Sequence, residues 1–284
     1  MHQHGYIGRK MRVPTLKEKP AIVIATFGTS SRAKAPLEIF QLELEKQLPD
    51  YEIFWAYSSN IICRKKKLPS LQTALAQVET AGFRKAIVQP LHIFPGTEYQ
   101  QMAETCEYFP GLRVFLSETL LHRWDFVKQT LAVVEQEFLP PEEGFNILAL
   151  HGTPLTADPV NIVYLGLAKL VTDLYPNVLA ASIEGVPDPD AVMTAIKRKN
   201  IASKYKKVRI IPMMYLAGMH TEDDLMGSDD DSWRTILENM GFVVDYPMVE
   251  YNKENYFKGL AYYPEVISFF MDRLQRSLKL ASVY

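Results

Sequence analysis

The sequence predicts an α/β protein made of two similar lobes, each with a parallel sheet. Short runs that are apolar throughout alternate with segments of helical periodicity along the chain. Strands that are apolar on both faces are typical of parallel sheets covered by helices on both sides. The alternation restarts close to residue 145, so the second half repeats the first. We expect the crossover connections between these strands to be right-handed.

The first half reads as four strands, each followed by a helix. In the first helix Leu37, Phe40 and Leu44 fall on one apolar stripe. The second helix has Ser70 at its start as N-cap and Gly82 just past its end. The expected strands are 21–27, 51–57, 85–93 and 112–118, and the expected helices are 34–48, 68–82, 99–109 and 122–139.

The second half follows the same order. Its expected strands are 145–150, 177–184, 206–216 and 242–249, and its helices are 160–175, 188–200, 232–241 and 264–281. The turn-rich stretch PPEEG at 140–144 is the expected linker. We therefore predict a flexible polar leader at 1–20, a first lobe at 21–140 and a second lobe at 141–284, whose final helix can pack back on the first lobe.

Composition excludes several classes of protein. The chain has 284 residues, 48% hydrophobic and 23% charged, with a formal net charge of −2, so nothing favours nucleic acid or an anionic membrane. The leader has no apolar core of a signal peptide, and no run of about 18 apolar residues could span a membrane. Two cysteines make no disulfide framework and fit a reducing compartment, so we expect a cytoplasmic protein.

The two halves share loop signatures where their strands end. Gly28 corresponds to Gly152 at an offset of 124, and Gly96 corresponds to Gly218 at an offset of 122. Ligands of such folds bind outside the carboxyl ends of the strands. The corresponding loops of both lobes are therefore expected to face one cavity.

Two histidines and one glutamate close predicted strands of the second lobe. These are His151 in LALHGTP, Glu184 in ASIEGVP and His220 in LAGMH. Two imidazoles and a carboxylate suit a borderline metal such as cobalt, nickel, iron or zinc. A single histidine at a strand end is more often a hydrogen-bonded structural residue, so the interpretation depends on the pair. The first lobe has Phe27 and Glu98 at the positions of His151 and His220.

Glu98 can be interpreted as a catalytic residue or as a structural one. A carboxylate at the rim of a cleft can act as a general base, and a glutamate in the first turn of a helix is also favoured by the helix dipole. The correspondence with His220 favours the functional reading. For His92, inside an apolar run, a buried hydrogen-bonded role is preferred.

Three further segments carry charge or small polar residues. TFGTSSR, with Ser30, Ser31 and Arg32, could hold an anion at a helix start, but it matches no nucleotide-binding motif. The basic run CRKKK, with Arg64, could meet an acidic ligand or be a solvated surface. The acidic stretch 222–233 is best explained as capping and charging the start of the helix that follows.

Together these segments resemble the anaerobic cobaltochelatase family of the CbiK type, which inserts cobalt into sirohydrochlorin. The resemblance covers nearly the whole chain from Ala21 onward. It is carried by TFGTS (26–30), LHIFPGTEY (91–99), HG (151–152), IEG (183–185), LAGMH (216–220) and SDDDSW (228–233). The family is similar in fold to ferrochelatase, which implies two Rossmann-like lobes around an active-site cleft.

The resemblance also implies roles for residues. His151 and His220 would bind the metal with Glu184 as third ligand, and Glu98 matches the active-site glutamate of the family. The substrate implied by the resemblance is rich in carboxylates. Their expected partners are the polar side chains of Ser30, Ser31, Arg32 and Arg64, and Phe27 is expected to offer an apolar surface beside them.

The expected activity is thus that of an ATP-independent metal chelatase, a lyase of cobalamin (vitamin B12) biosynthesis. Its partners would be a tetrapyrrole and a divalent metal ion, with no further cofactor and with a homo-oligomer as one possible state. One alternative is a ferrochelatase or nickel chelatase, since borderline ligands do not select the metal. The other is a haem- or metal-binding protein without turnover, against which Glu98 argues because simple binding needs no base.

Overall fold

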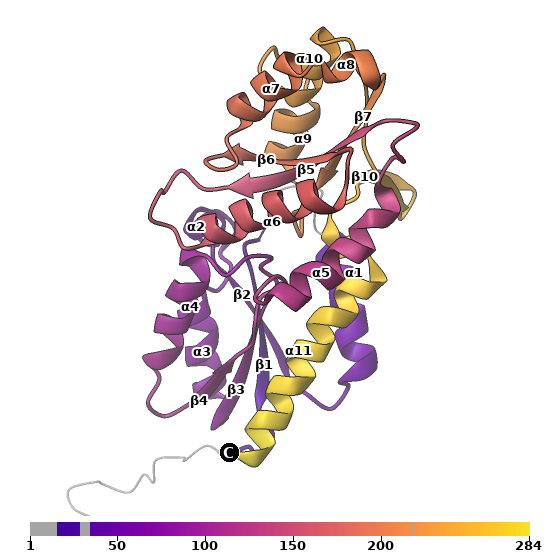
Figure 1. The fold of residues 1–284 in the computed structure, drawn as a ribbon. Helices are drawn as coiled ribbons and strands as arrows, with labels where there is room; N and C mark the ends of the chain where they lie inside the picture. The colour runs from indigo at the N-terminus through magenta and orange to yellow at the C-terminus, as the bar shows by residue number, and fades with distance from the viewer. Residues whose placement is uncertain (1–15, 29–34, 217) are drawn as a thin grey trace, which may run out of the picture.

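The computed structural model confirms the α/β fold with two lobes (Figure 1). It describes residues 16–28, 35–216 and 218–284, without the side chains of residues 219–221. Each lobe has a parallel four-stranded sheet, ordered β2-β1-β3-β4 in the first lobe and β6-β5-β7-β8 in the second. The two orders match position by position, so the repeat seen in the sequence is a repeat of topology.

The first lobe contains the elements up to Glu137. They are β1 (Ala21–Thr26), α1 (Ala35–Gln47), β2 (Ile53–Tyr57), α2 (Asn60–Lys66), α3 (Leu71–Thr80), β3 (Lys85–Pro90), α4 (Thr97–Glu107), β4 (Arg113–Leu116), α5 (Trp124–Val134) and the 3₁₀ turn η1 (Glu135–Glu137).

The second lobe contains the remaining elements except the final helix. They are β5 (Phe145–Gly152), α6 (Val160–Leu174), β6 (Val178–Glu184), α7 (Pro189–Arg198), α8 (Ile201–Lys204), β7 (Lys207–Pro212), α9 (Met219–Met226), α10 (Trp233–Asn239), β8 (Val243–Asp245), the hairpin β9 (Met248–Tyr251) and β10 (Glu254–Phe257), and the 3₁₀ turn η2 (Leu260–Tyr262). The chain ends with α11 (Pro264–Val283).

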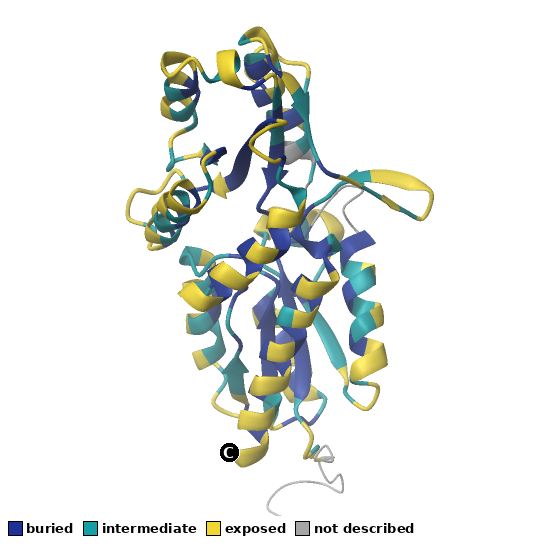
Figure 2. Ribbon diagram, turned by 45° about the vertical axis from the view of Figure 1, so that its right-hand side comes forward, coloured by how far each residue is buried: buried dark blue, intermediate teal, exposed yellow. Residues whose placement is uncertain are grey.

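The central strands are buried on both faces (Figure 2). In β1, Ile22 and Ile24 point into the core shared with α11, whereas Ala21 and Val23 point into a second core under α3. A strand alternates its side chains between faces, so covering both faces requires every position to be apolar. This explains the uninterrupted apolar runs of the sequence.

The loops that follow equivalent strands are held in the same way in both lobes. The amide of Leu120 donates to the carbonyl of His92 at 3.0 Å, and the amide of Leu260 donates to the carbonyl of Met214 at 2.8 Å. His92 and Met214 are related by the same offset of 122 as Gly96 and Gly218. The correspondence therefore extends from the strands into the loops at their carboxyl ends.

Several boundaries differ from the prediction. The expected strands 85–93 and 206–216 end at Pro90 and Pro212. The residue directly after each proline still donates to the neighbouring strand. The carbonyl of the next residue, His92 or Met214, accepts from a brace just described, so the chain leaves the ladder there. The expected strand 242–249 is divided between β8 and the first strand of the hairpin, β9. The first residues of the acidic stretch 222–233 belong to helix α9. Ser232 caps α10 as expected, accepting from the amide of Thr235 at 3.2 Å.

The helix α11 leaves the second lobe and packs along the first (Figure 1). The Ser117 hydroxyl donates to the Ser277 hydroxyl at 2.7 Å, and the Lys85 ammonium donates to the carbonyl of Ala281 at 2.7 Å.

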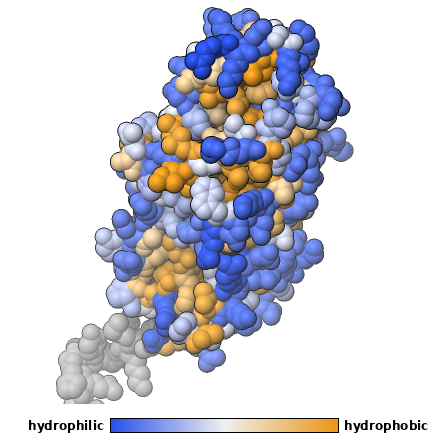
Figure 3. All heavy atoms as spheres, viewed as in Figure 1, coloured by the Kyte–Doolittle hydropathy of each residue, from blue (hydrophilic) through white to orange (hydrophobic). Residues whose placement is uncertain are grey.

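Within the described part of the chain no helix is long and apolar enough to cross a membrane. On the face viewed in Figure 3, apolar side chains lie in groups between polar ones.

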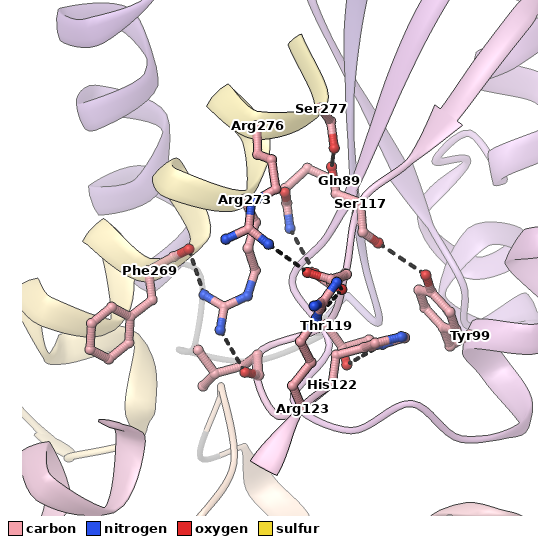
Figure 4. Close-up of polar contacts among 12 residues, drawn as sticks. Gln89, Tyr99, Ser117, Thr119, His122, Arg123, Phe269, Arg273, Arg276 and Ser277 are labelled. Atoms are coloured by element: carbon pink, nitrogen blue, oxygen red, sulfur yellow. Dashed lines mark hydrogen bonds and ion pairs between the residues drawn. The ribbon is translucent and has the colours of Figure 1, made fainter. Parts of the chain in front are cut away.

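Arg273 is the most buried charged group on this helix, with an exposed fraction of 3%. Its guanidinium donates to the carbonyls of Phe269 at 2.5 Å and Leu120 at 2.8 Å (Figure 4). The guanidinium also lies 4.0 Å from the ring centre of Phe126. Burial lowers the pKa of Arg273 to about 10, which still leaves it charged at neutral pH. Arg273 thus ties α11 to the loop that braces His92.

We expect Arg273→Ala to lower the free energy of unfolding by about 2–4 kcal/mol, because it leaves the buried Leu120 carbonyl unpaired and opens a cavity. Urea denaturation measures this loss. Arg276→Ala, one turn away, removes an exposed ion pair with Glu118 and should cost less than about 1 kcal/mol. Equal losses in the two variants would contradict the role assigned to Arg273.

Candidate functional site

The carboxyl ends of the two sheets meet where the lobes touch. The ring of Phe94, in the loop after β3, packs edge-on against Tyr164 of α6 at a centroid distance of 4.6 Å. The amide of Thr97 at the start of α4 donates to the Asp158 carboxylate of the second lobe at 3.2 Å. The loops after β3 and β5 therefore lie against each other, as the sequence predicted.

His151 and Glu184 end neighbouring strands of the second lobe. Gly152, the residue after His151, pairs with Glu184 in the ladder. This pairing brings the side chains of His151 and Glu184 together, with the His151 Nδ1 3.9 Å from the Glu184 Oε1. Gly152 has a φ of +81°, and a Cβ there would collide with the Glu184 carbonyl, so the position requires glycine. Both side chains stay open to solvent, with exposed fractions of 64% and 45%.

The ring of His151 is oriented by its own strand. Its Nδ1 lies 3.1 Å from the carbonyl of Gly152. A carbonyl can only accept, so this contact places the ring proton on Nδ1 and leaves the Nε2 lone pair free. An exposed imidazole with one free nitrogen, on a residue next to a carboxylate, is suited to binding a metal ion.

His220 does not close a strand, contrary to the prediction. It is the second residue of α9, well after β7 has ended at Pro212, because the intervening chain bonds to η2. Its backbone matches Glu98, the second residue of α4, and both helices follow a glycine N-cap. The side chain of His220 lies outside the described part. Among the described side chains no three potential ligands gather closely enough to hold a metal.

Glu98 forms a close pair with His92. The His92 Nε2 lies 3.0 Å from the Glu98 Oε2 and 3.4 Å from the Ser58 hydroxyl. The His92 side chain is only 10% exposed, whereas that of Glu98 is 46% exposed. His92 is thus largely covered and hydrogen-bonded, close to the expectation, but its partner is the candidate base, which the sequence did not indicate.

Asp158 joins the two lobes beside Glu98. Its Oδ1 accepts from the amide of Thr97, which opens α4, and from the amide of Val160 at 3.0 Å, which opens α6. One oxygen therefore caps a helix in each lobe and satisfies amides that a helix start leaves unpaired. Asp158 was not predicted as a site residue, although an Asp-Pro pair before a helix is a recognisable cap signal.

Tyr164, on α6, lies close enough to both candidate carboxylates for their charges to act on it. Its side chain is buried, and burial raises the pKa of its hydroxyl. A hydrogen bond with the backbone of Gly152 acts in the opposite direction, and the charges of Asp158, Glu98 and Glu184 raise the pKa further. Glu98 and Glu184, from different lobes, thus act on the same hydroxyl. The sequence offered no signal for Tyr164 beyond its place on an apolar helix face.

The remaining predicted residues lie around the same edges. Phe27 follows β1 and is 51% exposed. Arg64 is exposed on α2, since the basic run forms a short helix. The predicted residues Ser30, Ser31 and Arg32 lie outside the described residues.

The family model described as cobalt chelatase (CbiK) matches residues 20–279. The chain belongs to the cobalt chelatase (CbiK) family. It is therefore a metal chelatase, which confirms the resemblance seen in the sequence and the expected class of enzyme.

Two curated relatives of this chelatase are named for one reaction. The sirohydrochlorin cobaltochelatase CbiKC of Nitratidesulfovibrio vulgaris (strain Hildenborough) is 27% identical over 238 residues, covering 78% of this chain and 81% of the relative. The sirohydrochlorin cobaltochelatase of Salmonella typhimurium is 23% identical over 274 residues, covering 93% and 98%.

Solved structures of a chelatase from Bacillus subtilis share the fold of this chelatase. SirB with Fe³⁺ matches with a TM-score of 0.62 and 13% identity, covering 93% of this chain and 97% of SirB. The sirohydrochlorin chelatase SirB of Bacillus subtilis subspecies spizizenii in complex with cobalt matches with a TM-score of 0.57 and 14% identity, covering 92% and 96%. At this identity the likeness concerns the arrangement of the two lobes.

We expect Asp158→Ala to lower the free energy of unfolding by about 1–2 kcal/mol, because two helix starts lose a cap. Asp158→Asn keeps the Oδ1 acceptor and should lose less than half of that. Urea denaturation of the two variants compares them directly. An Asp158→Ala protein as stable as the original would show that this oxygen does not hold the lobes together.

Proposed function

We propose that this chelatase inserts Co²⁺ into sirohydrochlorin, in anaerobic cobalamin biosynthesis, through the residues at the facing edges of its sheets. The observation that carries the proposal is the pair of exposed side chains His151 and Glu184, whose Nδ1 and Oε1 lie 3.9 Å apart at the ends of neighbouring strands. The hydrogen bond of Nδ1 to a carbonyl leaves the Nε2 lone pair of His151 available. The names of both curated relatives support this choice of metal and tetrapyrrole.

His151, Glu184 and His220 are the proposed metal ligands. Two neutral imidazoles and a carboxylate bind a borderline divalent ion and leave coordination positions open for the nitrogens of the macrocycle. His151 and Glu184 are exposed, so the ion can be passed on. His220 is the second residue of α9, which follows β7 of the same sheet, and this supports its inclusion among the ligands.

Glu98 is the proposed base of the first lobe. Insertion breaks two pyrrole N–H bonds, the electron pairs stay on nitrogen to form the metal–nitrogen bonds, and two protons leave. A carboxylate across the cleft can take each proton in turn and release it to water. The exposed position of Glu98 suits this exchange.

The rest of the cleft would position the ring. The exposed Phe27 offers an apolar surface to one face of the macrocycle, and Arg64 with Ser30, Ser31 and Arg32 would bind its carboxylates. The reaction needs no cofactor besides the metal that is its substrate. Both cysteines in the described part are free thiols, which supports the proposal of a cytoplasmic enzyme.

The test is an insertion assay with purified protein, sirohydrochlorin and Co²⁺, followed by absorption. We expect the spectrum of the metallated ring to develop faster than without protein, and faster with sirohydrochlorin than with protoporphyrin. Acceleration by Fe²⁺ or Ni²⁺ alone would point to the alternative chelatase. No acceleration with any of the three ions would refute an insertion activity.

Substitutions then separate the proposed roles. We expect His151→Ala and His220→Ala each to lower kcat/KM by more than about 100-fold, beyond the loss typical of an outer-sphere partner. Glu98→Gln should lower kcat by about 100-fold or more while Co²⁺ binding changes little. Glu104→Gln, on the exposed side of the same helix, serves as the matched control. A greater loss of Co²⁺ affinity than of kcat in Glu98→Gln would make Glu98 a ligand.

A further inference from the structure

We propose that His92 is a positioning residue for Glu98, holding its carboxylate by a hydrogen bond from the Nε2–H so that one oxygen faces the substrate. This inference rests on the proposed function, because it concerns how Glu98 accepts protons. It assigns His92 no contact with the metal or the tetrapyrrole.

Both polar contacts of the His92 ring are made by one nitrogen. Nε2 lies 3.0 Å from the Glu98 Oε2, and the Ser58 hydroxyl lies 3.4 Å from the same nitrogen. Nδ1 is buried and has no hydrogen-bond partner among the described residues. A neutral imidazole carries one proton, and an N–H buried without an acceptor is unfavourable. The proton therefore belongs on Nε2, where the Glu98 carboxylate accepts it.

The same argument makes His92 a donor rather than a second base. Taking a proton from Glu98 would require the ring to carry N–H groups on both nitrogens. The group at Nδ1 would then be buried without an acceptor. His92 thus acts as a donor that orients the carboxylate, which leaves Oε1 of Glu98 to receive the pyrrole protons.

The backbone of His92 is fixed by a chain of contacts that reaches the C-terminal helix. The His92 carbonyl accepts from the amide of Leu120, whose own carbonyl accepts from the buried guanidinium of Arg273. Figure 4 shows Arg273 and its hydrogen bonds to the backbone. The position of His92 is therefore fixed both by the hydrogen bond of its backbone carbonyl and by the contact of its ring with Glu98.

The corresponding position of the second lobe argues that this pair is specific. There the same backbone hydrogen bond holds Met214, and the helix that follows carries His220 in place of Glu98. A methionine cannot donate a hydrogen bond. Only the lobe with the carboxylate thus has a donor at this position, although the two backbones are equivalent.

The experiment compares His92→Gln with His92→Met. These side chains have similar length and shape, but only glutamine can donate from the position of Nε2. We expect His92→Met to lower kcat for Co²⁺ insertion by about 10- to 100-fold with little change in either KM, as for the loss of an outer-sphere partner. His92→Gln should recover most of kcat. Urea denaturation of both variants reports whether the fold is intact.

A second readout does not depend on turnover. Nitrogen-15 NMR of the histidine rings, assigned by comparison with His92→Gln, should show His92 as the Nε2–H tautomer in the resting protein. Glu98→Gln should shift this signal.

Equal kcat in the glutamine and methionine variants, a change confined to KM, or a His92 protonated at Nδ1 would each overturn the inference. Absence of insertion by the unsubstituted protein would refute the proposed function, whereas the NMR result would still decide the pairing of His92 with Glu98.

Discussion

The parallel pairing of the strands is the constraint on which the rest of this structure depends. Parallel neighbours need a crossover after every strand, so all carboxyl ends of a sheet lie at one edge. Phe27, Glu98, His151, Glu184 and His220 each follow or end a strand at such an edge, or start the next helix. The crossover helices also cover both faces of each sheet, which leaves these edges as the place where polar groups can converge.

The two lobes use one backbone plan for different chemistry. Strand order, the positive-φ glycines, the loop braces and the glycine-capped helices recur in both. The side chains at equivalent positions differ: Phe27 against His151, and Glu98 against His220. In the proposed site one lobe would thus offer metal ligands and the other a base with an apolar surface. Inserting a cation through one face of a ring while removing protons needs this asymmetry.

Two contacts between distant parts of the chain keep the edges facing each other. Asp158 caps a helix of each lobe with one oxygen, immediately beside Glu98. The helix α11 starts from the second lobe and runs back along the first, where Arg273 fixes the loop that braces His92. Both contacts are polar and occupy sites where a backbone group would otherwise lack a partner. The geometry of the site therefore depends on residues outside it.

The sequence by itself determined the fold class, the repeat and the approximate strands and helices, because burial on both faces and helical periodicity are local patterns. It also pointed to His151 and Glu184, which end neighbouring strands and lie together in the structure. Only the tertiary structure decided that His92 pairs with Glu98, that Tyr164 is within reach of the charges of both carboxylates and that His220 belongs to a helix. These features arise from contacts between segments far apart in the chain, where no local spacing records which side chains meet.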